Sequence, residues 1–328
     1  DLAFTSADKT AADSLMRRFE PATAGSDYGE AYSTAYALAF GDSITRARAL
    51  AGLGSIPFYA YRRIIPLLGH PRFARTQAEA FRIARSRPEY ETVAATVDFG
   101  YGQSLLLTGK LGTLTEVVET GSMNPAAVSQ TLSIATLTDL PIPSAVYDGA
   151  LSAGSGDPAL GPMAALAAIR ALESGDRRSA RETIEGLRAG AGAMLAAGDS
   201  ATARLLTGVV RGLDARDAML QGRRAEALAE LEAVYREMGF PAAAAWAAEI
   251  LAEQGDTDRA IRYLEQLGAS PLVGLGLGEL YEKAGRPEEA LEAYGWVPLA
   301  WGSADPALQP RVAEARQAIA RLEGLGRD

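Results

Sequence analysis

The sequence predicts an all-α protein built from antiparallel helical hairpins, on three observations. Apolar residues recur at the i, i+3, i+4, i+7 spacing of an amphipathic helix in nearly every segment. No sustained apolar–polar alternation indicates a β-strand; the best strand candidate, residues 128–138, follows Pro125 and fits a helix at least as well. A glycine-centred turn also recurs along the second half of the chain.

Five glycines each end one helical pattern and open another. A glycine in the left-handed conformation is a common helix C-cap, and a polar residue after it starts the next helix. These glycines are Gly175, Gly198, Gly222, Gly255 and Gly285. Five residues past each glycine stands a small residue that permits close helix packing: Ala180, Ala203, Ala227, Ala260 and Ala290. Four residues further stands a larger residue, apolar in four of the five turns: Ile184, Thr207, Leu231, Leu264 and Tyr294.

The spacing of the glycines predicts the size of the repeating unit. The intervals are 23, 24, 33 and 30 residues. The last two match a two-helix repeat of about 34 residues. The two shorter intervals predict trimmed helices, and the glycines within residues 189–197 predict a short, poor helix there.

Residues 270–306 resemble a tetratricopeptide repeat. Gly278 occupies the small position of the first helix with Tyr281 three residues on, Gly285 the turn, and Ala290 and Tyr294 the second helix. Residues 241–269 fit the same pattern, with Ala248, Leu251, Gly255, Ala260 and Leu264. Residues 280–321 also resemble the end of repeat regions attached to bacterial serine/threonine kinases and related signalling proteins. The resemblance implies a right-handed superhelix whose first helices line an inner groove.

Three regions are expected along the chain. Residues 1–140 form a degenerate hairpin region rich in arginine and aromatic residues, 141–161 a Pro/Gly-rich hinge, and 162–328 the repeats. One continuous solenoid is the preferred interpretation, and two lobes meeting at the hinge is the alternative. A short helix is expected near residues 144–152. Residues 307–325 are expected to form a half-polar helix that caps the last hydrophobic face, with Asp305 as its N-cap.

The composition argues against most catalytic chemistry. The chain has no cysteine and one histidine, His70, which removes thiolate nucleophiles, zinc clusters and histidine-based triads. Asp98-Phe99-Gly100 matches a kinase magnesium triplet but lacks every other kinase element. The glycines of residues 274–278 lack dinucleotide-loop spacing and fit close helix packing instead. We expect no enzymatic activity, no cofactor and no metal.

The net charge of −9 argues against nucleic-acid binding, which draws its affinity from neutralising phosphates. Residues 1–104 contain 12 basic and 11 acidic side chains, and residues 105–328 contain 20 and 30. No apolar stretch is long enough for a transmembrane helix. The chain starts at Asp1 and not at a methionine, which favours a processed protein at a membrane or in the periplasm over a cytoplasmic one, or an excised piece.

Two charged surfaces and one aromatic stripe are candidate binding sites. Basic candidates that suit carboxylate, phosphate or lipid headgroups are Arg62, Arg63, Arg72, Arg75, Arg82 and Arg85. Acidic candidates on the first helices of the later repeats, with one lysine, are Glu249, Glu253, Glu279, Glu282 and Lys283. A solvated arginine face, or pairing with the acidic later half of the chain, is the plainer alternative for the first set. The stripe of Tyr28, Tyr32, Tyr36 and Phe40 is expected in the core rather than at an interface.

The main hypothesis for function is a non-catalytic scaffold or adaptor that binds a segment of a partner protein in its groove. The mostly acidic groove candidates predict a basic or amphipathic partner. One alternative is a structural subunit of a larger complex, which leaves self-association and peripheral membrane contact open. Another is the regulatory or sensory region of a kinase-type signalling protein.

Overall fold

The computed structural model describes residues 6–23, 26–55, 64, 70–154 and 161–325, and this part of the chain is all-α, without a strand. The first half contains α2 (Lys9–Thr23), α3 (Asp27–Phe40), α4 (Ser43–Gly52), η1 (Pro71–Phe73), α6 (Ala74–Arg85), η2 (Pro88–Val93), α7 (Ala94–Thr108), α8 (Leu111–Glu119), α9 (Pro125–Leu137) and α10 (Ser144–Gly154). The second half contains α11 (Gly161–Glu173), α12 (Arg177–Ala196), α13 (Ser200–Leu220), α14 (Arg224–Met238), α15 (Pro241–Glu253), α16 (Thr257–Glu265), α17 (Pro271–Lys283), α18 (Pro287–Trp301), η4 (Pro306–Leu308) and α19 (Gln309–Leu325). The predicted all-α, solenoid-like fold is confirmed.

The glycine turns act as the sequence predicts. All five adopt the left-handed conformation, with φ between +71° and +85°. The alanine five residues past each turn is buried in every case. Four of the turns join the helices of one hairpin: α11 to α12, α13 to α14, α15 to α16, and α17 to α18.

The prediction for residues 189–197 is wrong. Residues 189–196 are the last part of α12, a helix of 20 residues that ends at Ala196. Gly198 therefore separates two hairpins and does not lie inside one. The two short glycine intervals each correspond to a single long helix, α12 or α13, rather than to a pair of trimmed helices.

The glycines of α17 serve close packing against α18. A Cβ at Gly278 would lie 2.4 Å from the Tyr294 ring, and one at Gly274 would lie 2.7 Å from the Ala293 carbonyl oxygen. Both distances are too short for a real Cβ contact. The interpretation of this glycine run as a helix-packing motif is confirmed.

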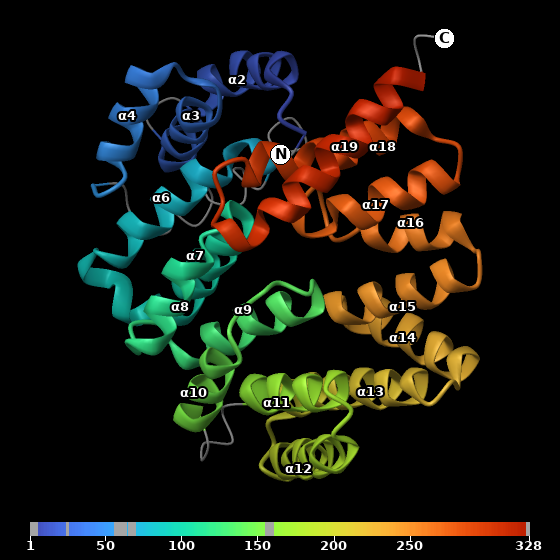
Figure 1. Ribbon diagram of the computed structural model, residues 1–328. Helices are drawn as coiled ribbons and strands as arrows, with labels where there is room; N and C mark the ends of the chain where they lie inside the picture. The colour runs from blue at the N-terminus through green and yellow to red at the C-terminus, as the bar shows by residue number, and fades with distance from the viewer. Residues whose placement is uncertain (1–5, 24–25, 56–63, 65–69, 155–160, 326–328) are drawn as a thin grey trace.

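The chain follows a curved path that brings its two halves together (Figure 1). Helices α7, α9, α11, α13 and α15 pack in succession along the inner side of the curve. Across the curve, α9 also contacts α15, and α7 contacts α17 and α18. The chain itself therefore occupies part of the space that an open superhelix would leave as a groove.

The two halves meet in what we call the closure contact, between the end of α18 and the end of α7. Trp301 is fully buried and donates its Nε1–H to the carbonyl oxygen of Leu106 at 3.0 Å. The backbone N–H of Asp305 donates to the Gly109 carbonyl at 3.0 Å, and the Asp305 carboxylate accepts from the Gly112 N–H at 2.7 Å. The Asp305 side chain therefore binds the other half of the chain. The prediction that this side chain caps the last helix is wrong.

The last helix extends the closure contact. The apolar stripe of α19 buries Val312 and Ala315, and α19 packs on α18, as expected of a cap. Its polar side is not simply solvated: Arg311 donates to the Thr138 carbonyl at 3.0 Å and pairs with Asp139 at 3.3 Å. The cap therefore also joins the repeats to the end of α9.

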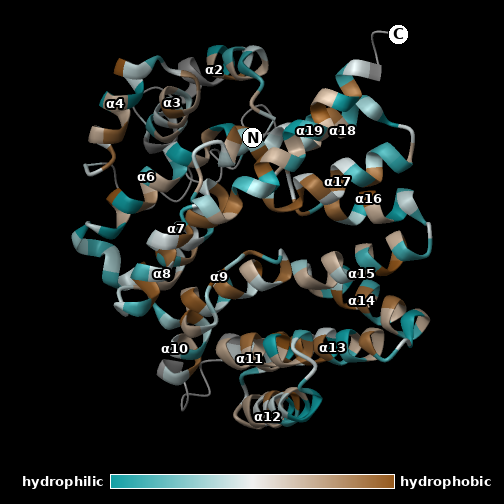
Figure 2. Ribbon diagram, viewed as in Figure 1, coloured by the Kyte–Doolittle hydropathy of each residue, from teal (hydrophilic) through white to brown (hydrophobic). Residues whose placement is uncertain are grey.

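Apolar side chains form two cores. One joins residues of the first half, from Ala31 to Leu166, with residues of the last hairpins and α19, from Ala248 to Ala318. The other lies within the first repeat hairpins, from Ala168 to Ile250. Hydrophobic and hydrophilic residues alternate along most of the helices (Figure 2). The larger core is therefore continuous across the closure contact.

Within the proposed hinge at residues 141–161, residues 144–154 are helical, and residues 155–160 lie outside the described part of the chain. The short helix expected near residues 144–152 is present as α10. Helix α9 before the segment packs directly against α11 after it. The division into regions at 1–140, 141–161 and 162–328 stays a prediction.

The closure contact can be tested at Gly109. A Cβ at Gly109 would lie 2.3 Å from the Cβ of Ala304, whereas one at Gly121 would meet nothing within 4 Å; both glycines have positive φ. We expect Gly121→Ala to cost about 1 kcal/mol from the left-handed backbone alone. We expect Gly109→Ala to cost about 1–3 kcal/mol more, because the two halves must move apart. Urea denaturation of both variants measures the difference in the free energy of unfolding. Equal losses would show that Gly109 is not closely packed against Ala304.

Candidate partner-binding surfaces

A buried arginine joins three first helices of successive hairpins. Arg216 on α13 is 6% exposed, and its guanidinium pairs with Glu173 on α11 at 2.8 Å and with Glu249 on α15 at 2.7 Å. The guanidinium also lies 5.5 Å from the centre of the Trp246 ring. A buried cation needs such partners, because desolvation of an unpaired charge is costly. This ladder fixes the spacing of the three helices.

Two other acidic candidates also have partners within the chain. Glu253 pairs with Arg224 at 2.7 Å, between α15 and α14. Glu282 accepts hydrogen bonds from the Tyr294 hydroxyl and from Arg321 of α19, both at 2.6 Å. These bonds, countered by desolvation, lower the pKa of Glu282, so it stays ionised. Glu282 thus holds the cap helix against the last hairpin.

Glu279 and Lys283 are the candidates that remain available. Both are exposed on α17, and neither forms an ion pair within the described part of the chain. They lie four residues apart, one turn along the same side of the helix. Glu279 is thus the carboxylate of the predicted acidic surface that forms no ion pair among the residues described.

The arginine candidates within the described part of the chain differ in their contacts. Arg62 and Arg63 lie outside the described residues. Arg75 donates to the Ser303 hydroxyl at 2.6 Å and so belongs to the closure contact. Arg82 is exposed and pairs with Glu79 on its own helix. Arg72 is exposed beside His70.

Arg85 is a structural residue. Its guanidinium pairs at 2.8 Å with Asp98, which is fully buried, and lies 4.7 Å from the Tyr101 ring. Asp98 also accepts from the Tyr90 hydroxyl at 2.7 Å and from the Asn124 N–H at 2.6 Å. This carboxylate therefore ties together α6, η2, α7 and the start of α9.

The Asp98-Phe99-Gly100 triplet has a packing explanation. The carboxylate of Asp98 is used in the buried network, and a Cβ at Gly100 would lie 2.0 Å from the Phe81 ring. Gly100 thus lets α6 and α7 approach closely. Both residues serve the fold at these positions.

The remaining sequence candidates also lie in structural positions. His70 accepts the Arg72 N–H at Nδ1 and begins η1; burial, and then the charge of Arg72, lower its pKa, so it is neutral near pH 7. Tyr32, Tyr36 and Phe40 are partly buried and pack against the larger core, as expected. The side chain of Tyr28 lies outside the described part.

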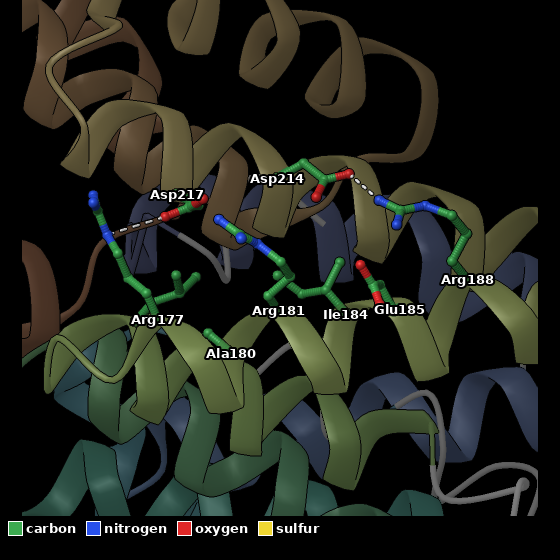
Figure 3. A pocket seen from close by; sticks show the side chains of 9 residues that line it. Arg177, Ala180, Arg181, Ile184, Glu185, Arg188, Asp214 and Asp217 are labelled. Atoms are coloured by element: carbon green, nitrogen blue, oxygen red, sulfur yellow. Dashed lines mark hydrogen bonds and ion pairs between the residues drawn. The ribbon is translucent and has the colours of Figure 1, made fainter.

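Two hollows lie along one side of α13, and sequence reasoning did not find them. The first lies between α12 and α13, and its floor and rim are formed by Leu172, Arg177, Ala180, Arg181, Ile184, Glu185, Arg188, Asp214 and Asp217. Figure 3 shows the Arg181 side chain between two ion pairs, Arg177–Asp217 at 3.4 Å and Arg188–Asp214 at 2.7 Å. The second hollow, of about 240 Å³, is lined by Leu195, Ser200, Ala203, Arg204, Thr207, Gly208, Arg211, Glu237 and Met238.

One sequence signal does mark the second hollow. Thr207 lies nine residues after its turn glycine, where the other four turns have Ile184, Leu231, Leu264 and Tyr294. Those four side chains are buried or half-buried, whereas Thr207 is exposed. A short polar side chain at this position leaves the space beside α13 unfilled.

Comparison with known proteins does not identify a family for the chain. No protein-family model matches it, and no curated protein matches it in sequence. Among the described residues, no cluster of three or more histidine, cysteine or acidic side chains could hold a metal ion. In the same part of the chain, every helix is too short or too polar to cross a membrane.

Neutralising the two carboxylates that pair with Arg216 should destabilise the fold more than neutralising the exposed carboxylate Glu253. Glu173→Gln/Glu249→Gln leaves a buried guanidinium without a charged partner, and we expect a loss of about 2 kcal/mol in the free energy of unfolding. The control Glu253→Gln removes an exposed pair and should cost less than about 1 kcal/mol. Thermal and urea unfolding measure both variants. Equal small losses would mean that the ladder does not hold the three helices.

Proposed function

We propose that the chain is a non-catalytic scaffold or adaptor that holds a segment of a partner protein against its stacked hairpins. The observation that carries this proposal is the architecture itself: successive hairpins present their first helices side by side. Stacked hairpins of this kind offer long surfaces for protein segments. The resemblance of residues 270–306 to a tetratricopeptide repeat supports the same function.

The partner is a basic or amphipathic segment, and it binds along the exposed carboxylates of the first helices. Glu249 and Glu253 are about half exposed although each is paired, and Glu279 is exposed on the next hairpin without an ion pair among the described residues. Carboxylates arranged on neighbouring helices favour a cationic partner by charge complementarity. Because α9 and α7 fill part of the inner space, the segment lies on the exposed edge of these helices.

Glu279→Lys tests this proposal without disturbing the Arg216 ladder. We expect the partner recovered by affinity purification from the native source to be lost, or to bind at least about tenfold more weakly, with a stronger effect at low salt. The fold should be unchanged, because Glu279 forms no ion pair in the described part of the chain.

The matched control is Glu292→Lys, which makes the same charge change at an exposed position of α18. It should retain the partner. If both variants retain the partner equally, the acidic surface does not bind it. If both lose it equally, the interaction depends on net charge and not on this site.

A further inference from the structure

We propose that the side of α13 that carries the two hollows is a second docking surface, and that it takes an acidic amphipathic helix of a partner protein. We call this surface the α13 groove; it comprises the residues lining both hollows. Ala203, Thr207 and Arg211 follow one another at four-residue spacing and therefore share a side of the helix. From Ser200 to Asp217 the α13 residues that line the two hollows span about 25 Å of helix.

The α13 groove is separate from the acidic surface. Arg216, which forms the carboxylate ladder, is nine residues from Thr207. Nine residues are two and a half helical turns, so the two side chains point to opposite sides of α13. The two surfaces can therefore bind different segments at the same time.

The groove is open because the residues around it are small or short. Thr207 stands where the other four turns have a larger side chain. Met238 of α14 folds over Gly208, where a Cβ would overlap its sulfur. A larger residue at Thr207 would narrow the space beside α13.

The groove has a slight excess of basic side chains in an acidic protein. The residues that line it include five arginines and four acidic residues, in a chain of net charge −9. Arg177, Arg188 and Arg211 are paired with carboxylates of α13 and α14. Arg181 and Arg204 are exposed, one in each hollow, and neither has an ion-pair partner among the residues described. Each can receive a carboxylate from outside.

Apolar surface accompanies these arginines. Leu195 is 63% exposed at the rim of the second hollow, beside Ala203 and the half-buried Met238. Ile184 and Leu172 reach the first hollow from below. An exposed leucine between guanidinium groups fits a ligand that is apolar on one side and anionic at its edges.

An amphipathic acidic helix satisfies both features. Its apolar side covers Leu195 and Met238, and its carboxylates meet Arg181 and Arg204. A helix of about 16 residues spans the length of the groove. A basic segment is disfavoured by the two unpaired guanidinium groups.

The probe is a fluorescent synthetic 16-residue helical peptide with leucine on one side and glutamate elsewhere. Its affinity for the full chain is measured by fluorescence anisotropy at about 0.15 M salt, where exposed charges are screened beyond about 8 Å. Arg181→Glu/Arg204→Glu should bind the peptide at least tenfold more weakly, and Leu195→Ser should also weaken binding. Unchanged melting temperatures would show that these exposed substitutions leave the fold intact.

The matched control is Arg262→Glu/Arg316→Glu, which makes the same charge change at exposed arginines outside the groove. It should bind the peptide like the parent chain. Equal weakening by both double variants, or equal binding of a peptide with lysine in place of glutamate, would overturn the proposal. Sedimentation should show that the parent chain is a monomer. If the parent chain is instead a dimer, and Arg181→Glu/Arg204→Glu dissociates that dimer, the proposal is also overturned. The groove would then be occupied by a second copy of the chain.

Discussion

The burial of Trp301 against the end of α7 is the contact on which the shape of this protein depends. Its indole donates to Leu106, and the turn that follows exchanges hydrogen bonds with Gly109 and Gly112. These residues are nearly 200 positions apart, so the contact closes a very long loop of chain. Because the larger core continues across it, the first half and the last hairpins share buried apolar surface, and neither half completes its core alone.

Closure changes which surfaces of the stacked hairpins are exposed. In an open superhelix the inner groove is the natural site, but here α9 contacts α15 and α7 contacts α17. The exposed edge of the first helices and the outer side of α13 remain. The first carries carboxylates, and the second carries Arg181 and Arg204, which have no ion-pair partner among the residues described. The two proposals therefore assign partner segments of opposite charge to these two surfaces.

The local structure was predictable because it depends on residues close in sequence. Glycine turns, the buried alanines after them and the capping helix all follow from short-range rules. The prediction of trimmed helices on either side of Gly198 failed because each short glycine interval contains one long helix, α12 or α13, and not a pair of short ones. Arg85 and Arg75 resemble their exposed neighbours in sequence; only the folded chain places one beside buried Asp98 and the other beside Ser303. The closure contact has no periodic signal, because its partners are brought together by the path of the whole chain.

The absence of cysteine from the sequence makes closure directly measurable. Lys110 and Ser303 lie on opposite sides of the closure contact and are exposed, with the lysine Nζ donating to the Ser303 carbonyl at 3.1 Å. Lys110→Cys/Ser303→Cys treated with a short thiol cross-linker should give complete intramolecular cross-linking of a monomer with unchanged helix content. The pair Lys110→Cys/Arg178→Cys joins the turn between α7 and α8 to α12, which lies far from both helices in Figure 1, and should give none. A folded Lys110→Cys/Ser303→Cys protein that does not cross-link would contradict the closed fold.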